Sequence, residues 1–204
     1  MTPIPTQLSS LIATTQWAHQ KQFTPATGGN FSIRHQTASC FITRSSVDKG
    51  KLTPEDFLEI NWQKNTVMGI GKPSAETALH TMLYQLDDNI QTVLHTHSLT
   101  TTVLSHLCNA DEFIFHHWEM KKVLSGVTSH KTPVALAVFD NDQDISALAE
   151  QVKQRWQQHP LRWGLLVRGH GLYSWGQNTE QAQLQLEGLE FLFQAEVLRR
   201  QLER

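Results

Sequence analysis

Two histidines stand one residue apart at the end of an apolar segment near the middle of the chain, QTVLHTHSL. Because residues i and i+2 of a strand point to the same side, His95 and His97 are expected to present two imidazoles next to each other. Imidazole is a common metal ligand, but a His-x-His pair is also ordinary polar surface at a strand end. The pair alone therefore indicates a metal site only weakly.

A third histidine strengthens that indication. His170 follows a second apolar segment and lies between two glycines, in LLVRGHGLYSW. Glycines beside a histidine allow a tight turn that brings the ring close to a neighbouring group. Three histidines with an open coordination position form the ligand set of a catalytic zinc site, and no cysteine pair here has the spacing of a structural one. The three rings predict a metal that polarises a carbonyl group.

Two glutamates compete for the acid–base role beside such a metal. Glu76 lies in the first turn of a predicted helix after GKPSA, where the helix dipole alone is enough to explain a carboxylate. Glu119 follows the aromatic-rich run FIFHHW, and an apolar setting there is expected to raise its pKa into the range useful for catalysis. The residue types leave both glutamates as candidates.

Composition excludes several classes of protein. The 204 residues include 17 basic and 19 acidic side chains with a formal charge of −2 and no basic run, so neither a nucleic acid nor an anionic membrane is an expected partner. Two cysteines, Cys40 and Cys108, indicate a reducing compartment. The first residues lack a signal-peptide pattern and no apolar stretch has the length of a bilayer, which predicts a cytoplasmic protein.

The pattern of apolar residues predicts the elements that position these side chains. Predicted helices cover residues 7–22, 99–108, 144–157 and 179–202, and another begins near Ser74 as its N-cap. Predicted strands lie within residues 24–34, 38–46, 55–62, 89–97, 133–140 and 163–175, and the first two form a hairpin. Strands joined by short turns and mixed with helices favour an α/β fold of the α+β or mixed-sheet type, in one domain over residues 1–204.

Taken in order, the segments TGGNFSIR, ITRSS, LTPED, KPSAETALH, VLHTHS and VRGHGLYSWG resemble the class II aldolase/adducin-like family over nearly the whole chain. The resemblance implies a central, mainly antiparallel sheet flanked by helices. It also implies a metal-dependent lyase or epimerase of sugar phosphates, with one Zn²⁺ per subunit bound by His95, His97 and His170. The family implies a homotetramer with sites near subunit interfaces. The segments DKGKLTPEDFLEI, HHWEMKKVLSGVTSH and VFDNDQDI point, within the family, to its dehydratases.

The resemblance also implies roles for the remaining site residues. The position matching Glu119 is the acid/base of the dehydratases, whereas the position matching Glu76 does that work in the aldolases. The loops that hold the substrate phosphate match Gly28, Gly29, Asn30, Ser45, Ser46 and Ser74, and many relatives have glycine where Ser46 stands. A glycine-rich turn and a helix N-terminus favour an anion on physical grounds as well. An aldolase, an epimerase or a non-catalytic scaffold of the same fold are the alternatives.

Overall fold

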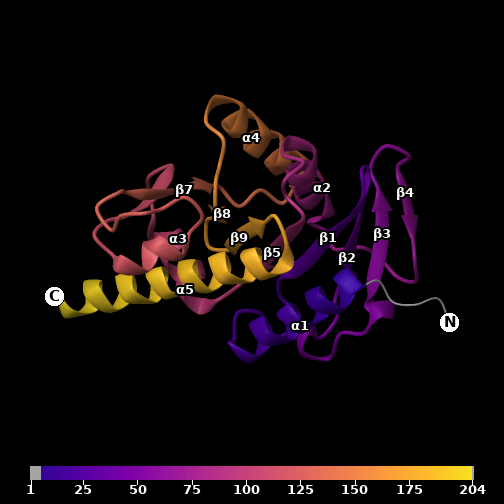
Figure 1. Ribbon diagram of the computed structural model, residues 1–204, viewed down its shortest axis with the longest axis horizontal. Coiled ribbons are helices and arrows are strands. Elements are labelled where there is room, and N and C mark those ends of the chain that lie inside the picture. The colour runs from indigo at the N-terminus through magenta and orange to yellow at the C-terminus, as the bar shows by residue number, and fades with distance from the viewer. Residues whose placement is uncertain (1–5, 204) are drawn as a thin grey trace.

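Nine strands form one continuous sheet in the computed structural model, which describes residues 6–203 (Figure 1). Along the sheet the order is β4-β3-β2-β1-β5-β9-β8-β7-β6. The bounds are β1 Asn30–Gln36, β2 Ser39–Thr43, β3 Phe57–Asn61, β4 Thr66–Met68, β5 Thr92–Thr96, β6 Glu112–Phe115, β7 Val134–Phe139, β8 Gly164–Val167 and β9 Gly171–Gly176.

Every neighbouring pair in the sheet is antiparallel except β7 and β8, which run parallel. The expected hairpin is present, because β1 and β2 pair directly. Strand β5, which carries His95, is the middle strand and lies between β1 and β9. The predicted α/β fold with a mainly antiparallel sheet is therefore confirmed.

Helices cover both faces of the sheet. On one face α1, α3 and α5 pack over the strands, and on the other face α2 and α4 pack together (Figure 1). Their bounds are α1 Thr6–Gln20, α2 Thr77–Leu86, α3 Leu99–Leu107, α4 Ile145–Gln158 and α5 Thr179–Leu202. Among the described residues, none of the helices combines the length and the apolar character needed to traverse a bilayer.

Two hydrophobic cores result, one on each face, and this explains why the central strand β5 is buried at every position. Leu94 packs into the core under α5, whereas its neighbour Val93 packs into the core under α2 and α4. Leu172 and Tyr173 of β9 divide in the same way. Because side chains alternate along a strand, His95 lies on the same face as Val93, which is the face that α2 covers.

The structure also contains elements that the apolar pattern does not predict. The short edge strands β4 and β6 pair with one neighbour each, and three short 3₁₀ helices lie at Lys49–Lys51, Pro54–Asp56 and Glu119–Val123. The assignment of Ser74 as the N-cap of α2 is wrong, because the helix begins at Thr77 with Glu76 at the N-cap position. Ser74 instead closes the preceding turn, with its hydroxyl accepting from the Glu76 N–H at 3.3 Å.

Candidate metal centre and active site

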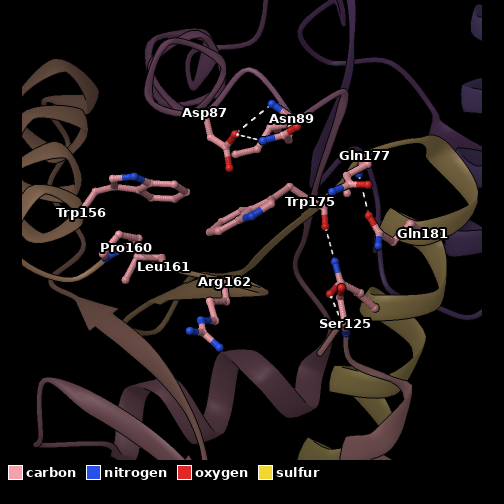
Figure 2. Close-up of a pocket in the computed structure, with 13 residues that line it drawn as sticks. Asp87, Asn89, Ser125, Trp156, Pro160, Leu161, Arg162, Trp175, Gln177 and Gln181 are labelled. Atoms are coloured by element: carbon pink, nitrogen blue, oxygen red, sulfur yellow. Dashed lines mark hydrogen bonds between the residues drawn. The ribbon is translucent and has the colours of Figure 1, made fainter. Parts of the chain in front are cut away.

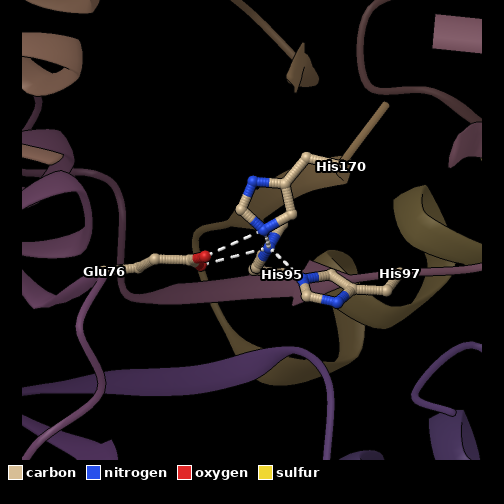
Figure 3. A group of neighbouring side chains, drawn as sticks. All are labelled: Glu76, His95, His97 and His170. Carbon is tan, nitrogen blue, oxygen red and sulfur yellow. Dashed lines mark hydrogen bonds and ion pairs between the residues drawn. The ribbon is translucent and has the colours of Figure 1, made fainter. Parts of the chain in front are cut away.

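Four side chains from different elements converge at the C-terminal end of β5 (Figure 3). They are Glu76, His95, His97 and His170, and one possible ligand atom from each lies within 4.8 Å of all the others. The Glu76 carboxylate is 3.1 Å from His95 Nε2 and 2.9 Å from His170 Nε2. His97 Nε2 lies 2.8 Å from His95 Nε2, so the three rings turn the same type of nitrogen toward one point.

Strand register is the reason for this convergence. Asn30 of β1, His95 of β5 and Tyr173 of β9 are direct cross-strand partners and form one row across the sheet. All three contact one oxygen of Glu76: the Asn30 amide donates to Oε2 at 2.7 Å, and the Tyr173 hydroxyl donates to it at 2.6 Å. A shift of one residue in any of these strands would turn its member of the row to the opposite face.

The protonation of the rings suits metal binding. His95 Nδ1 lies 3.0 Å from the Leu172 carbonyl, to which it donates, so that Nε2 carries the free lone pair. Burial lowers the pKa of His95 well below its ordinary value and lowers that of His97 to about 4. Both rings are therefore neutral near neutral pH, which is the form that binds a cation.

Glu76 is held as an anion. Burial on its own raises the pKa of this carboxyl, but the rings of His95 and His170 and the Asn30 amide more than offset that effect and hold the pKa well below its usual range. Its side chain makes no capping bond to helix α2, because it turns into the histidine group instead. Glu76 therefore occupies the N-cap position of α2, but its carboxylate does not cap the helix.

A buried chain of hydrogen bonds supports Glu76 from the side of α2. The Tyr84 hydroxyl and Ser32 hydroxyl are 2.7 Å apart, and Ser32 lies 2.7 Å from His80 Nδ1. His80 Nε2 in turn lies 2.5 Å from the side-chain amide oxygen of Asn30, Oδ1. Burial lowers the pKa of His80 to about 4, so its ring is neutral and can accept at one nitrogen while donating at the other. Sequence spacing suggests a direct pair between His80 and Glu76, but the contact runs through Asn30.

The four residues fit a divalent cation. Three imidazoles and one carboxylate are ligands that suit zinc and other first-row divalent metals. Each donor atom lies within 2.8–3.4 Å of a neighbouring donor atom. His170 Nδ1 is buried and has no hydrogen-bond partner among the described residues. Such crowding of lone pairs is unfavourable unless a cation or protons separate them, so the arrangement indicates a divalent metal site.

The glycines of the GGN segment have a steric role beside this site. A Cβ on Gly28 would lie 2.8 Å from His97 Nδ1, and one on Gly29 would lie 2.5 Å from the His95 carbonyl oxygen. Gly29 also has a φ of +78°, which side-chain-bearing residues rarely adopt. The two glycines therefore let this turn pack directly against the strand that carries the histidines.

The other residues predicted to bind phosphate lie on two adjacent loops. Ser45 and Ser46 are exposed, with their hydroxyls 3.4 Å apart. The Ser45 N–H donates to the Lys72 carbonyl, which brings the loop next to the segment that contains Ser74. Ser46 adopts a φ of +60°, a conformation that favours glycine.

Lys49 lies between the glycine turn and the serine loop, and its residue type and position in the sequence give no signal of this. Its side chain is buried, and Nζ donates to the Thr27 carbonyl at 2.8 Å and to the Val47 carbonyl at 3.0 Å. Lys49 thereby joins the glycine turn to the serine loop. Its neighbour Asp48 pairs with Lys51 instead, and no described carboxylate forms an ion pair with Lys49. A buried ammonium without an anion is unusual and marks a place where an anionic ligand is favourable.

Glu119 lies outside the convergent group. Its side chain is 71% exposed and lies 2.6 Å from Lys122 Nζ and 3.5 Å from His130 Nδ1. The expectation that its pKa is raised by an apolar setting is wrong for the single chain, since the hydrogen bond from Lys122 lowers that pKa. The adjacent Met120 and the nearby Ile114 also expose apolar surface.

A cavity of 260 Å³ lies at the opposite end of β5 and β9 (Figure 2). The ring centres of Trp156 and Trp175 lie 5.8 Å apart there with their planes tilted by 45°, and Asp87 and Arg162 contribute to its walls. Its lining contains no histidine or cysteine. The cavity is therefore separate from the metal group, which adjoins the other end of the same strands.

Known proteins resemble the chain along nearly its whole length. It is 51% identical over 197 residues to a methylthioribulose-1-phosphate dehydratase of Yersinia enterocolitica, covering 97% of this chain and 94% of that protein. A protein of the same name from Pectobacterium carotovorum is also 51% identical, with 97% and 96% covered.

Solved structures of the same architecture have much lower identity. An L-fuculose 1-phosphate aldolase superposes with a TM-score of 0.81 at 21% identity, covering 99% of this chain and 90% of the other. The aldolase of that name from Thermus thermophilus gives 0.77 at 22%, with 97% and 96% covered. These likenesses establish the fold. The family model described as Class II Aldolase and Adducin N-terminal domain matches residues 9–197, and the chain therefore belongs to this family.

Proposed function

We propose that the protein is a zinc-dependent dehydratase that converts 5-methylthioribulose 1-phosphate to 5-methylthio-2,3-dioxopentyl phosphate and water. This reaction belongs to methionine salvage, and we place it in the cytoplasm. The observation that supports the proposal most strongly is the Glu76–His95–His97–His170 group, in a chain 51% identical to proteins named for this reaction. Residues 1–204 would act as one domain with one Zn²⁺.

A bound divalent metal would polarise the C2 carbonyl of the substrate and make the neighbouring C3 proton more acidic. We assign removal of that proton to the Glu119 carboxylate. The electron pair of the C3–H bond then forms the C3–C4 double bond, and the C4 hydroxyl leaves as water after taking up the proton that Glu119 removed from C3. Tautomerisation of the resulting enol gives the 2,3-diketone. One C–H and one C–O bond break, and one molecule of water is lost.

We propose that Glu119 reaches the metal group of a neighbouring subunit in a homotetramer. In its own chain this carboxylate is exposed and pairs with Lys122, apart from the histidines. Ile114 is 45% exposed and Met120 is 36% exposed, and apolar side chains on the surface around Glu119 suit a contact between subunits. Glu76 is less suited to proton transfer, because Asn30 and Tyr173 both donate to its Oε2.

For the substrate phosphate we propose the two loops that contain Gly29, Asn30, Ser45 and Ser46, together with the segment of Ser74. Backbone N–H groups and serine hydroxyls of this kind bind phosphate without a full charge. Lys49 would add that charge from beneath the loops. This assignment predicts that affinity for the phosphate depends on Lys49.

Replacing Lys49 by Met should raise KM for the phosphorylated substrate about 10- to 100-fold, the range expected for a lost hydrogen bond to a charged group of about 1.5–3 kcal/mol. Lys51→Met is the matched control, because Lys51 lies two residues away and is 84% exposed. Steady-state kinetics and the metal content of both variants are the measurements. If the two variants have equal KM values, Lys49 does not bind the substrate phosphate.

The function itself is tested by incubating the zinc-loaded protein with 5-methylthioribulose 1-phosphate and measuring the product mass. Loss of one water supports the dehydratase. Cleavage into two fragments would identify an aldolase, and an isomer of unchanged mass would identify an epimerase. Absence of bound metal after gentle purification, together with no turnover on added zinc, would favour a non-catalytic scaffold.

A further inference from the structure

Glu190, in the middle of helix α5, is a buried carboxyl that the proposed reaction does not use. Glu190 is 1% exposed, and no lysine, arginine or histidine of the described residues forms an ion pair with it. Burial raises its pKa to about 7. A carboxyl in such a place is costly compared with an apolar side chain, so its contacts need an explanation.

Those contacts lie on both sides of a metal-binding histidine. The Thr96 hydroxyl donates to Glu190 Oε1 at 3.2 Å, and the Ser98 hydroxyl donates to Oε2 at 2.6 Å. Thr96 and Ser98 are the residues immediately before and after His97, and both are buried. A planar carboxyl that accepts from both hydroxyls fixes their separation, and with it the backbone that carries the His97 ring.

The same contact anchors helix α3. Ser98 is the N-cap of α3, and its hydroxyl also accepts from the Thr101 N–H at 3.2 Å. One turn further along the helix, the Thr102 hydroxyl donates to the His170 carbonyl at 3.0 Å. The Ser105 hydroxyl accepts from the Gly169 N–H at 3.1 Å. Helix α3 therefore holds the His170 turn as well, and its start is fixed to α5 through Glu190.

We propose that Glu190 is a positioning residue for the metal group, fixing His97 through Thr96 and Ser98, and His170 through helix α3. The inference rests on the metal site of the proposed function and is independent of the substrate. Partners that orient the ligands of a metal typically contribute 10- to 100-fold to metal affinity. Glu190 contacts the residues on either side of His97 and not the ring itself. Its loss should therefore change the geometry of the metal site as well as its affinity for the metal.

The experiment compares metal binding by the full-length apo-protein and by three variants. Glu190→Leu removes both acceptors at similar volume, Glu190→Gln keeps one acceptor and one polar contact, and Glu187→Gln is the control on the same helix. Glu187 pairs at the surface with Lys21. Co²⁺ titration followed by d–d absorption gives both affinity and coordination geometry, and zinc affinity follows from competition with a chromophoric chelator.

We expect Glu190→Leu to bind Co²⁺ about 10- to 100-fold more weakly with an altered d–d spectrum. Glu190→Gln should recover most of the affinity, and Glu187→Gln should match the unchanged protein. A folded Glu190→Leu variant with unchanged affinity and spectrum would overturn the inference. If that variant does not fold, Thr96→Val is the test, because it removes one of the two donors to Glu190 at nearly constant side-chain shape. Unchanged metal binding by Thr96→Val would also overturn the inference.

The same titration separates this inference from the proposed function. If the unchanged protein binds neither Co²⁺ nor zinc, the proposed metal-dependent reaction fails, and the positioning role fails with it. If metal binding depends on Glu190 but methylthioribulose phosphate is not dehydrated, the positioning role stands and only the proposed reaction fails.

Discussion

Glu119→Gln is expected to lower kcat about 100- to 10,000-fold while the protein retains its full metal content. The range is that of a lost general acid–base group, and glutamine has the size of glutamate without its ability to accept a proton. The metal stays bound because Glu119 lies outside the group formed by Glu76 and the three histidines. Single-turnover kinetics with zinc-loaded protein and metal analysis by atomic absorption measure the two quantities separately.

The chain offers a closely matched control for that variant. Glu150 is 53% exposed and pairs with Lys153 three residues on, as Glu119 pairs with Lys122. Glu150→Gln should leave kcat unchanged. A Glu119→Gln enzyme that keeps most of its activity, while Glu76→Gln loses it with metal still bound, would assign the base to Glu76 instead.

A mixing experiment tests whether Glu119 and the metal group of one active site come from two different subunits. Mixing an inactive Glu119→Gln subunit with an inactive His95→Ala subunit should restore part of the activity, because some sites then receive an intact Glu119 and an intact metal group. If both residues serve the same subunit, the mixed assembly stays inactive. This outcome would place Glu119 and the metal in one chain.

His95→Ala is expected to have the largest effect on metal binding. Loss of a residue that only hydrogen-bonds a ligand lowers metal affinity by up to about 100-fold. Because His95→Ala removes a ligand itself, zinc affinity should fall by more than that. Removal also leaves the Glu76 carboxylate without one of its two imidazole contacts. Chelator competition measures the affinity, and kcat/KM at limiting zinc should fall in parallel.

His159→Ala is the control for loss of an exposed histidine, since His159 follows α4 and its side chain forms no hydrogen bond or ion pair with the described residues. The His95→Ala protein should remain folded, which circular dichroism checks. Unchanged zinc affinity in that folded variant would show that His95 is not a ligand.

The architecture follows from the sequence where periodicity is strong. The helix predicted over residues 179–202 has those bounds in the structure, and the turn expected at 169–171 separates β8 from β9. Edge strands are harder to predict, because a strand such as β4 is three residues long and has no buried residue. Its formation depends on pairing with β3, a tertiary contact that local sequence does not contain.

Part of the candidate site can be predicted from the sequence. Spacing in the strand is enough to predict that His95 and His97 share a face, and glycines draw attention to His170. Nothing local places Asn30 and Tyr173 on either side of His95, because that depends on the register of three strands far apart in sequence. The same holds for the burial of Lys49 and Glu190, neither of which has an ion-pair partner among the described residues. Burial of a charge is a property of the folded chain.

The central place of β5 has a consequence for folding. Glu76, His95 and His170 come from separate parts of the chain, and they meet only after β5 has paired with both β1 and β9. Such long-range pairing forms slowly and late, because loop-closure entropy has to be overcome first. A metal ion that binds only the completed sheet stabilises the native state by mass action. Release of the ion should therefore coincide with global unfolding, so that a metal-sensitive dye can follow denaturation of the whole molecule.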